Sequence, residues 1–143
     1  MRSRVFALVL FAVVATSCRE GLLFRNDHRV TILSPKNNAA VAEPVSVRWS
    51  AREFVAGQDG QFAVFVDRDP MPPGEGIEYF AASNRAQGVF LLNETNLTID
   101  VFTRRTGVDP AERDHHDVTV VLLDTSGRRI GESAGFVEFR IKR

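Results

Sequence analysis

The chain has 143 residues, and its 18 Lys and Arg balance 18 Asp and Glu, so the formal net charge at pH 7 is zero. This balance excludes the strongly basic composition that is typical of nucleic-acid-binding domains. The length fits one ordinary domain, and a hydrophobic content of 44% is enough to build its core. We therefore predict one folded domain and no nucleic-acid partner.

The N-terminus has the features of a secretory signal. Arg2 and Arg4 supply positive charge, an apolar run extends from Val5 to Ala15, and small residues precede Cys18. The apolar run is shorter than the roughly 20 residues that a membrane-spanning helix needs. We predict that the chain is exported and that residues 1–17 are a signal peptide.

The only cysteine of the chain directly follows this signal, and a single cysteine cannot form an internal disulfide. The residues ATSC (15–18) resemble the lipobox of bacterial lipoproteins, in which the cysteine receives a diacylglycerol and becomes the mature N-terminus. The resemblance implies that Cys18 is the lipid attachment site. Arg19 is not the Asp that the sorting rule of Gram-negative lipoproteins associates with the inner membrane, so in a Gram-negative cell the resemblance points to the outer membrane.

Ala15 departs from the lipobox pattern, because the family usually has Leu at that position. Two alternatives therefore stay open. In one, Cys18 is lipidated and residues 18–27 tether residues 28–143 to a membrane. In the other, an ordinary signal peptidase cleaves near Ser17, and the protein is secreted without an anchor.

From residue 28 onward, apolar and polar residues alternate in short segments that are separated by turn sequences. The predicted strands are RVTILSP (29–35), PVSVRWS (44–50), QFAVFVD (61–67), NLTIDVF (96–102), HDVTVVLLD (116–124) and GFVEFRI (135–141), with IEYFAA (77–82) and GVFLL (88–92) as a weaker pair. Six to eight short strands without a long amphipathic helix predict an all-β fold. We expect a single antiparallel β-sandwich of about seven strands.

Two of these segments resemble a known family. PVSVRWS is similar to the second strand of fibronectin type III and related immunoglobulin-like domains, where a Trp ends an alternating strand. DVTVVLLDTSGRRIGES (117–133) is similar to their sixth strand, the following turn and the start of the last strand. His116 stands where the fibronectin pattern has a Tyr. The resemblance covers roughly His28 to Arg143, and it implies an immunoglobulin-like sandwich that acts by presenting surfaces.

The densest polar cluster is ERDHHD, residues 112–117. Histidines and carboxylates bind zinc or copper, so His115 and His116, joined by His28, are candidate metal ligands. Adjacent histidines on a strand point to opposite faces, which disfavours chelation of one ion. The favoured interpretation makes His116 a corner residue hydrogen-bonded to the backbone and leaves His115 exposed. We predict no metal site and no cofactor, with an envelope metal-binding protein as the alternative.

Other motifs add little chemistry. DRDPMPPGEGIE (67–78) carries four carboxylates, but their spacing matches no calcium loop, and the prolines favour a stiff extended segment. Asn93 and Asn96 begin Asn-x-Thr sequons that matter only in a eukaryotic secretory pathway, and we interpret them as chance. No nucleophile elbow, zinc-protease motif or phosphate-binding loop is present, so we predict no enzymatic activity.

The segment HDVTVVLLD is apolar on both faces, because Val121 and Leu123 alternate with the residues assigned to the core. Phe65, on the strand expected beside it, also points away from the core. Exposed apolar patches often mark partner surfaces, so Phe65, Val121 and Leu123 are predicted contact residues. The alternative is that residues 71–92 cover them, using Ile77, Tyr79, Phe80, Val89 and Phe90. Together these observations predict a cell-envelope lipoprotein with a non-catalytic binding or assembly module and an envelope protein as partner.

Overall fold

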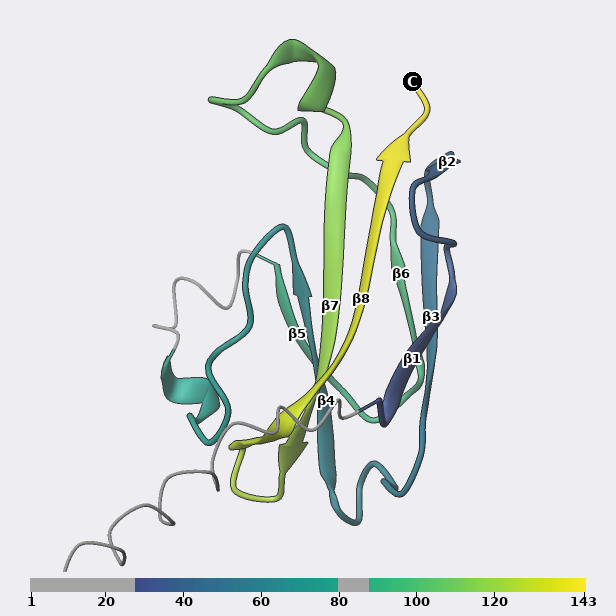
Figure 1. Ribbon diagram of the computed structural model, residues 1–143. Coiled ribbons are helices and arrows are strands. Elements are labelled where there is room, and N and C mark those ends of the chain that lie inside the picture. The colour runs from purple at the N-terminus through teal and green to yellow at the C-terminus, as the bar shows by residue number, and fades with distance from the viewer. Residues whose placement is uncertain (1–27, 80–87) are drawn as a thin grey trace, which may run out of the picture.

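The computed structural model describes residues 28–79 and 88–143, which form two β-sheets (Figure 1). The predicted signal peptide, the tether and Cys18 lie outside the described residues. The first sheet has the order β1-β3-β6, with β1 at Val30–Ser34, β3 at Val45–Ala51 and β6 at Asn96–Ile99. The second has the order β2-β8-β7-β4-β5, with β2 at Ala39–Val41, β4 at Gly60–Val66, β5 at Val89–Leu92, β7 at His115–Asp124 and β8 at Arg129–Ile141.

The predicted all-β class and the β-sandwich are confirmed. In immunoglobulin-like sandwiches the first, second and fifth strands face the third, sixth and seventh. When the short strand β2 is left out of the count, β1, β3 and β6 are the first, second and fifth strands. β4, β7 and β8 are then the third, sixth and seventh, so the architecture is immunoglobulin-like. Two details differ from the prediction of about seven antiparallel strands: the described residues form eight strands, and β2 pairs with β8 in parallel. The three residues of β2 are too few to show an alternating pattern.

One predicted strand is wrong in its described part. IEYFAA begins with a single turn of 3-10 helix, η1 (Ile77–Tyr79), in which the Tyr79 amide donates to the Gly76 carbonyl. The preceding prolines and glycines keep this segment out of the sheet, because Pro lacks the amide proton that a central strand needs. A second short turn, η2 (Pro110–Glu112), precedes β7. Within the described ranges, no helix is long and apolar enough to cross a membrane.

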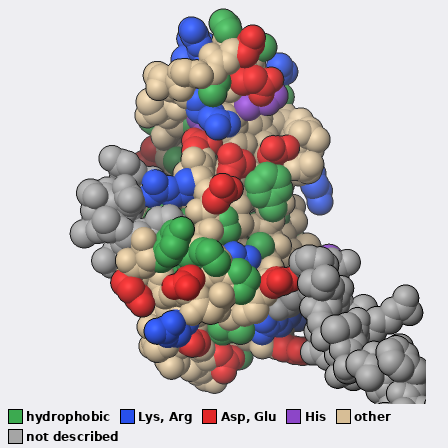
Figure 2. Space-filling model, turned by 60° about the vertical axis from the view of Figure 1, so that its left-hand side comes forward, with side chains coloured by type: hydrophobic (Ala, Val, Ile, Leu, Met, Phe, Trp, Pro, Cys, Tyr) green, Lys and Arg blue, Asp and Glu red, His purple; other side chains and the backbone are tan. Residues whose placement is uncertain are grey.

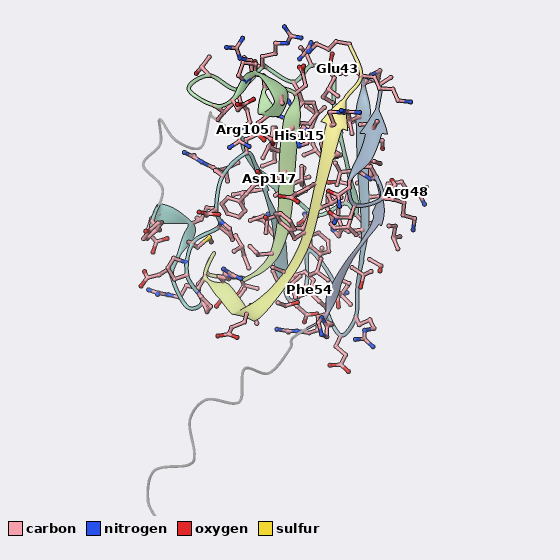
Figure 3. All side chains as sticks on the ribbon, turned by 45° about the horizontal axis from the view of Figure 1, so that its top comes forward. Glu43, Arg48, Phe54, Arg105, His115 and Asp117 are labelled. Carbon is pink, nitrogen blue, oxygen red and sulfur yellow. The ribbon has the colours of Figure 1, made fainter. Side chains whose placement is uncertain are left out.

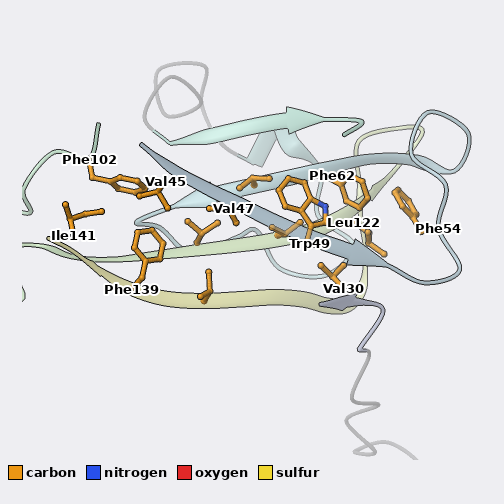
Figure 4. Packing of buried hydrophobic residues seen from close by; sticks show 14 residues of the cluster. Val30, Val45, Val47, Trp49, Phe54, Phe62, Phe102, Leu122, Phe139 and Ile141 are labelled. Atoms are coloured by element: carbon orange, nitrogen blue, oxygen red, sulfur yellow. The ribbon is translucent and has the colours of Figure 1, made fainter. Parts of the chain in front are cut away.

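The main core lies between the two sheets and follows the predicted alternation within most strands (Figure 4). The predicted strand 96–102 is an exception, because it ends at Ile99 and the chain then exposes Val101 and buries Phe102. Its buried residues are Val30, Val45, Val47, Trp49, Phe54, Phe62, Val64, Phe102, Val118, Val120, Leu122, Val137, Phe139 and Ile141. Phe62 lies at the centre of an aromatic group. Its ring meets Trp49 edge-on at 5.5 Å and Phe54 at 5.3 Å between centroids. Aromatic pairs in this geometry stabilise a core beyond the area they bury.

The loop between β6 and β7 is fastened to the end of β8 through Asp114. Arg104 donates two hydrogen bonds to the Asp114 carboxylate, at 3.1 and 3.2 Å, and the Arg143 Nε donates a third at 2.7 Å. These bonds, first the one from Arg143 and then those from Arg104, hold the pKa of the Asp114 carboxyl below its ordinary value. Arg143 also donates to the Phe102 carbonyl at 2.6 Å, so the contacts close one end of the sandwich.

Candidate functional site

The outer face of the five-stranded sheet was the predicted partner surface, and the prediction that its apolar residues are exposed is wrong. Phe65, Val121 and Leu123 do point away from the main core. However, Phe65 and Val121 are 0% exposed and Leu123 is 1% exposed, within a second apolar cluster. These three residues therefore cannot serve as surface contacts in this structure.

The alternative prediction, that the middle segment covers this patch, is correct in part. Met71, Ile77 and Val89 pack into the second cluster. Tyr79 and Phe90 do not cover it, because they are 60% and 38% exposed, and Phe80 lies outside the described residues. The outer face thus has a lower part, sealed by residues 71–79, and an upper part nearer the start of β7.

The upper part of the outer face carries an exposed aromatic ring beside charged groups. On neighbouring strands, Thr119 pairs with Phe136 and Asp117 pairs with Glu138. Phe136 is 53% exposed, and Glu138 is exposed beside it. In the middle of the face shown in Figure 2, acidic side chains lie next to hydrophobic ones. We define Asp117, Phe136 and Glu138, together with the buried Thr119 beneath them, as the open face.

The open face contains a carboxyl group, that of Asp117, whose pKa is shifted by its surroundings. Burial, followed by the negative charge of Asp67, raises the pKa of the Asp117 carboxyl above its ordinary value. Arg105 acts in the opposite direction, and Asp69 and Glu138 add smaller raising effects. Arg105, His115 and Asp117 are labelled around the start of β7 in Figure 3. The ionised form of Asp117 is therefore disfavoured in the fold.

Asp117→Asn is expected to stabilise the protein at neutral pH. A folded-state pKa above the unfolded value of 3.8 means that ionised Asp117 carries a penalty above the folded pKa, and the penalty vanishes as the pH falls toward 3.8. The gain from Asn should accordingly be present at pH 7 and absent below pH 3.8. Solvent screening of a partly exposed carboxylate keeps the gain small. Thermal melts at both pH values measure it, with the exposed Asp100→Asn as control, and a loss of stability at pH 7 would contradict the prediction.

His116 forms the corner between β4 and β7, but not through the backbone bond that was predicted. Its imidazole is fully buried, and its Nδ1 lies 2.8 Å from the Asp67 Oδ2. A carboxylate accepts hydrogen bonds, so Nδ1 is the donor in this contact. The other oxygen, Oδ1, accepts from the Asp117 amide at 3.2 Å, and the Asp67 amide donates to the Asp117 carbonyl at 2.9 Å. Asp67 therefore does the bracing that was expected of the backbone.

The candidate metal ligands are not brought together. His116 packs against Phe102 and Phe139, with ring centroids at 4.7 and 6.4 Å. The His115 side chain is 45% exposed, and its Nδ1 lies 3.2 Å from the Glu112 carboxylate. His28 is exposed at the start of β1, where its carbonyl accepts from Arg52. Within residues 28–79 and 88–143, no group of three or more His, Cys, Asp or Glu side chains could hold a metal ion.

Sequence patterns missed two residues that organise this region. Asp67 has a positive φ of 54° at the end of β4, and Arg129 binds the segment that seals the lower part of the outer face. Both act through partners about 50 residues away in the chain, so no local pattern reveals them. Phe136 occupies an outward position in GFVEFRI, but the alternation of the segment does not give its 53% exposure.

The two packed sheets define the chain as a β-sandwich with immunoglobulin-like strand order. No protein-family model matches the chain, and no curated protein matches it. Among solved structures, it is similar to the fibronectin(III)-like modules of CbhA from Clostridium thermocellum. That match has a TM-score of 0.44 and 11% sequence identity, and it covers 79% of this chain and 95% of that one.

Proposed function

We propose that this chain is a cell-envelope lipoprotein that is anchored through Cys18 and presents a non-catalytic β-sandwich for binding or assembly. The anchor places the domain on the extracytoplasmic side of a membrane, and in a Gram-negative cell on the outer membrane. The signal-like residues 1–17 and the position of Cys18 directly after them support the anchor.

The composition of the open face supports a binding role. An aromatic ring that is 53% exposed between charged groups is suited to a partner contact, because aromatic residues are enriched at interfaces and a polar rim surrounds them. The half-buried Asp117 raises the energy of the unbound face, and a cationic group of a partner would relieve that cost. The partner is therefore an envelope protein that offers an apolar and a basic side chain together.

The anchor is tested on the mature protein from membrane fractions, with Cys18→Ala as the comparison. The expected N-terminal peptide begins at Cys18 and carries acyl mass, and both the acyl mass and membrane association are lost in the variant. An unmodified peptide recovered from the culture medium would overturn the anchor and support the secreted alternative.

The binding role is tested in the same cells by placing a photoreactive phenylalanine analogue at position 136. A matched probe at position 33 serves as the control, because Leu33 is 43% exposed on the three-stranded sheet. We expect a discrete protein adduct from position 136 that is absent from position 33. Equal labelling at both positions, or no adduct at position 136, would contradict a partner contact on the open face.

A further inference from the structure

The lower part of the outer face is sealed by the cover segment, residues 71–79. Met71 is fully buried, and Met71 and Ile77 pack against Phe65, Val121 and Leu123. None of the described members of the cover segment belongs to the main core between the two sheets. The cover segment therefore packs on one face of the five-stranded sheet, and the main core lies on the other face.

The cover segment is held mainly by the turn between β7 and β8. The Gly74 amide donates to the Arg129 carbonyl at 3.0 Å, and the Arg129 amide donates to the Glu75 carbonyl at 2.9 Å. The Ile77 amide donates to the Gly127 carbonyl at 2.9 Å. These three bonds lie side by side and join one short stretch of chain to another, so they can break together.

The Arg129 side chain adds a clasp to these backbone bonds. Its Nη1 donates to the Met71 carbonyl at 2.6 Å, next to the apolar residue that the cover segment buries most deeply. Its Nη2 donates to the Glu132 carbonyl at 3.4 Å, and its Nε is buried without a hydrogen-bond partner. Burial lowers the pKa of Arg129 from its ordinary value, and the negative charge of Glu132 opposes this effect.

The Arg129 side chain stabilises the closed cover, but by less than its hydrogen bonds alone would. A guanidinium that is partly removed from water loses solvation that its bonds to carbonyls only partly replace. When the cover segment leaves, Arg129 regains water. The main core stays intact, because its residues lie on the other side of the sheet.

We infer that residues 71–79 are a cover that opens as one unit while the sandwich stays folded, with Arg129 as its clasp. In the open form, Phe65 and Leu123 become accessible from the outer face. Cooperative units of this kind open at a lower free energy than global unfolding requires. The device does not depend on the lipid anchor or on the open face, so its test is independent of the proposed function.

Native-state hydrogen exchange of the mature full-length protein, followed residue by residue at low denaturant concentrations, tests this inference. The amides of Gly74, Ile77 and Arg129 are expected to share one opening free energy. They should exchange roughly a hundredfold faster than the amides of β4 and β7, because a sub-global opening costs less than unfolding. The opening free energy of these amides should fall with denaturant concentration, with a slope smaller than that of global unfolding. The slope scales with the surface exposed, and opening exposes only the second cluster.

The variant Arg129→Ala is expected to speed exchange at Gly74 and Ile77 by about fivefold to tenfold, the effect of one lost hydrogen bond. Global unfolding also breaks this bond, so the β4 amides should speed by the same factor and stay roughly a hundredfold slower than Gly74 and Ile77. Arg140→Ala, at an exposed position on the same strand, is the matched control and should change neither set. Two results with the wild-type protein would overturn the inference. In one, the exchange rates of the three amides do not depend on denaturant; in the other, the three amides have the same opening free energy as the β4 amides.

Discussion

Replacing Phe62 by Ala is expected to lower the free energy of unfolding by about 3 to 5 kcal/mol, the range for truncating a buried aromatic side chain. Phe62 is 2% exposed and contacts both Trp49 and Phe54. The truncation removes apolar area from the core and leaves a cavity that the rigid strands on both sides cannot fill. Denaturant unfolding followed by the fluorescence of the single Trp measures the loss.

Phe136→Ala is the matched control, because it makes the same chemical change at a side chain that is 53% exposed. Its cost should stay below about 1 kcal/mol, since surface substitutions rarely exceed that value. A conservative Phe62→Leu change should recover most of the stability. Equal losses at positions 62 and 136 would contradict the assignment of Phe62 to the centre of the core.

Asp67→Ala is the second substitution with a large expected effect, about 2 to 4 kcal/mol of lost stability. The change removes the acceptor for the buried His116 ring and the acceptor for the Asp117 amide. An unpaired buried donor costs more than the bond contributed. Ala also tolerates a positive φ less well than Asp or Asn does, and Asp67 has a φ of 54°. Equilibrium unfolding at neutral pH measures the loss.

Two further variants separate the causes of this loss. Asp67→Asn keeps an acceptor and the preference for positive φ, so it should cost less than Asp67→Ala. Asp69→Ala removes a carboxylate only two residues away at an exposed position, and it should change stability by less than about 0.5 kcal/mol. If Asp67→Ala costs no more than Asp69→Ala, the bracing role of Asp67 is wrong.

Most of the fold could be predicted because each long strand carries its own pattern. In PVSVRWS the buried residues Val45, Val47 and Trp49 alternate with exposed ones, and the structure keeps that alternation. The short parallel strand β2 could not be predicted, because its three residues become a strand only through pairing with β8. IEYFAA failed for a different reason: the prolines and glycines before it keep Ile77–Tyr79 in a 3-10 turn outside the sheet, and Tyr79 is 60% exposed there.

The candidate site was less predictable than the fold. The sequence placed Phe65 and Val121 correctly on the outer face but could not decide their exposure, because the cover comes from a separate segment held by Arg129. His116 was expected at a corner and lies there, yet its partner Asp67 is 49 residues away. Long-range pairs of this kind are fixed by topology, which a single sequence reveals only in outline.

The parallel pairing of β2 with β8 has a mechanical consequence. The described chain begins at one end of the sandwich and Arg143 lies at the other, as Figure 1 shows. A pull between these ends slides β2 along β8 and strains the bonds across Ala39–Phe139, Ala40–Arg140 and Val41–Ile141 at the same time. Bonds that share a shearing force resist it better than bonds that are peeled apart one after another. A domain held at its N-terminal end and engaged at the opposite end would therefore resist tension through this short strand.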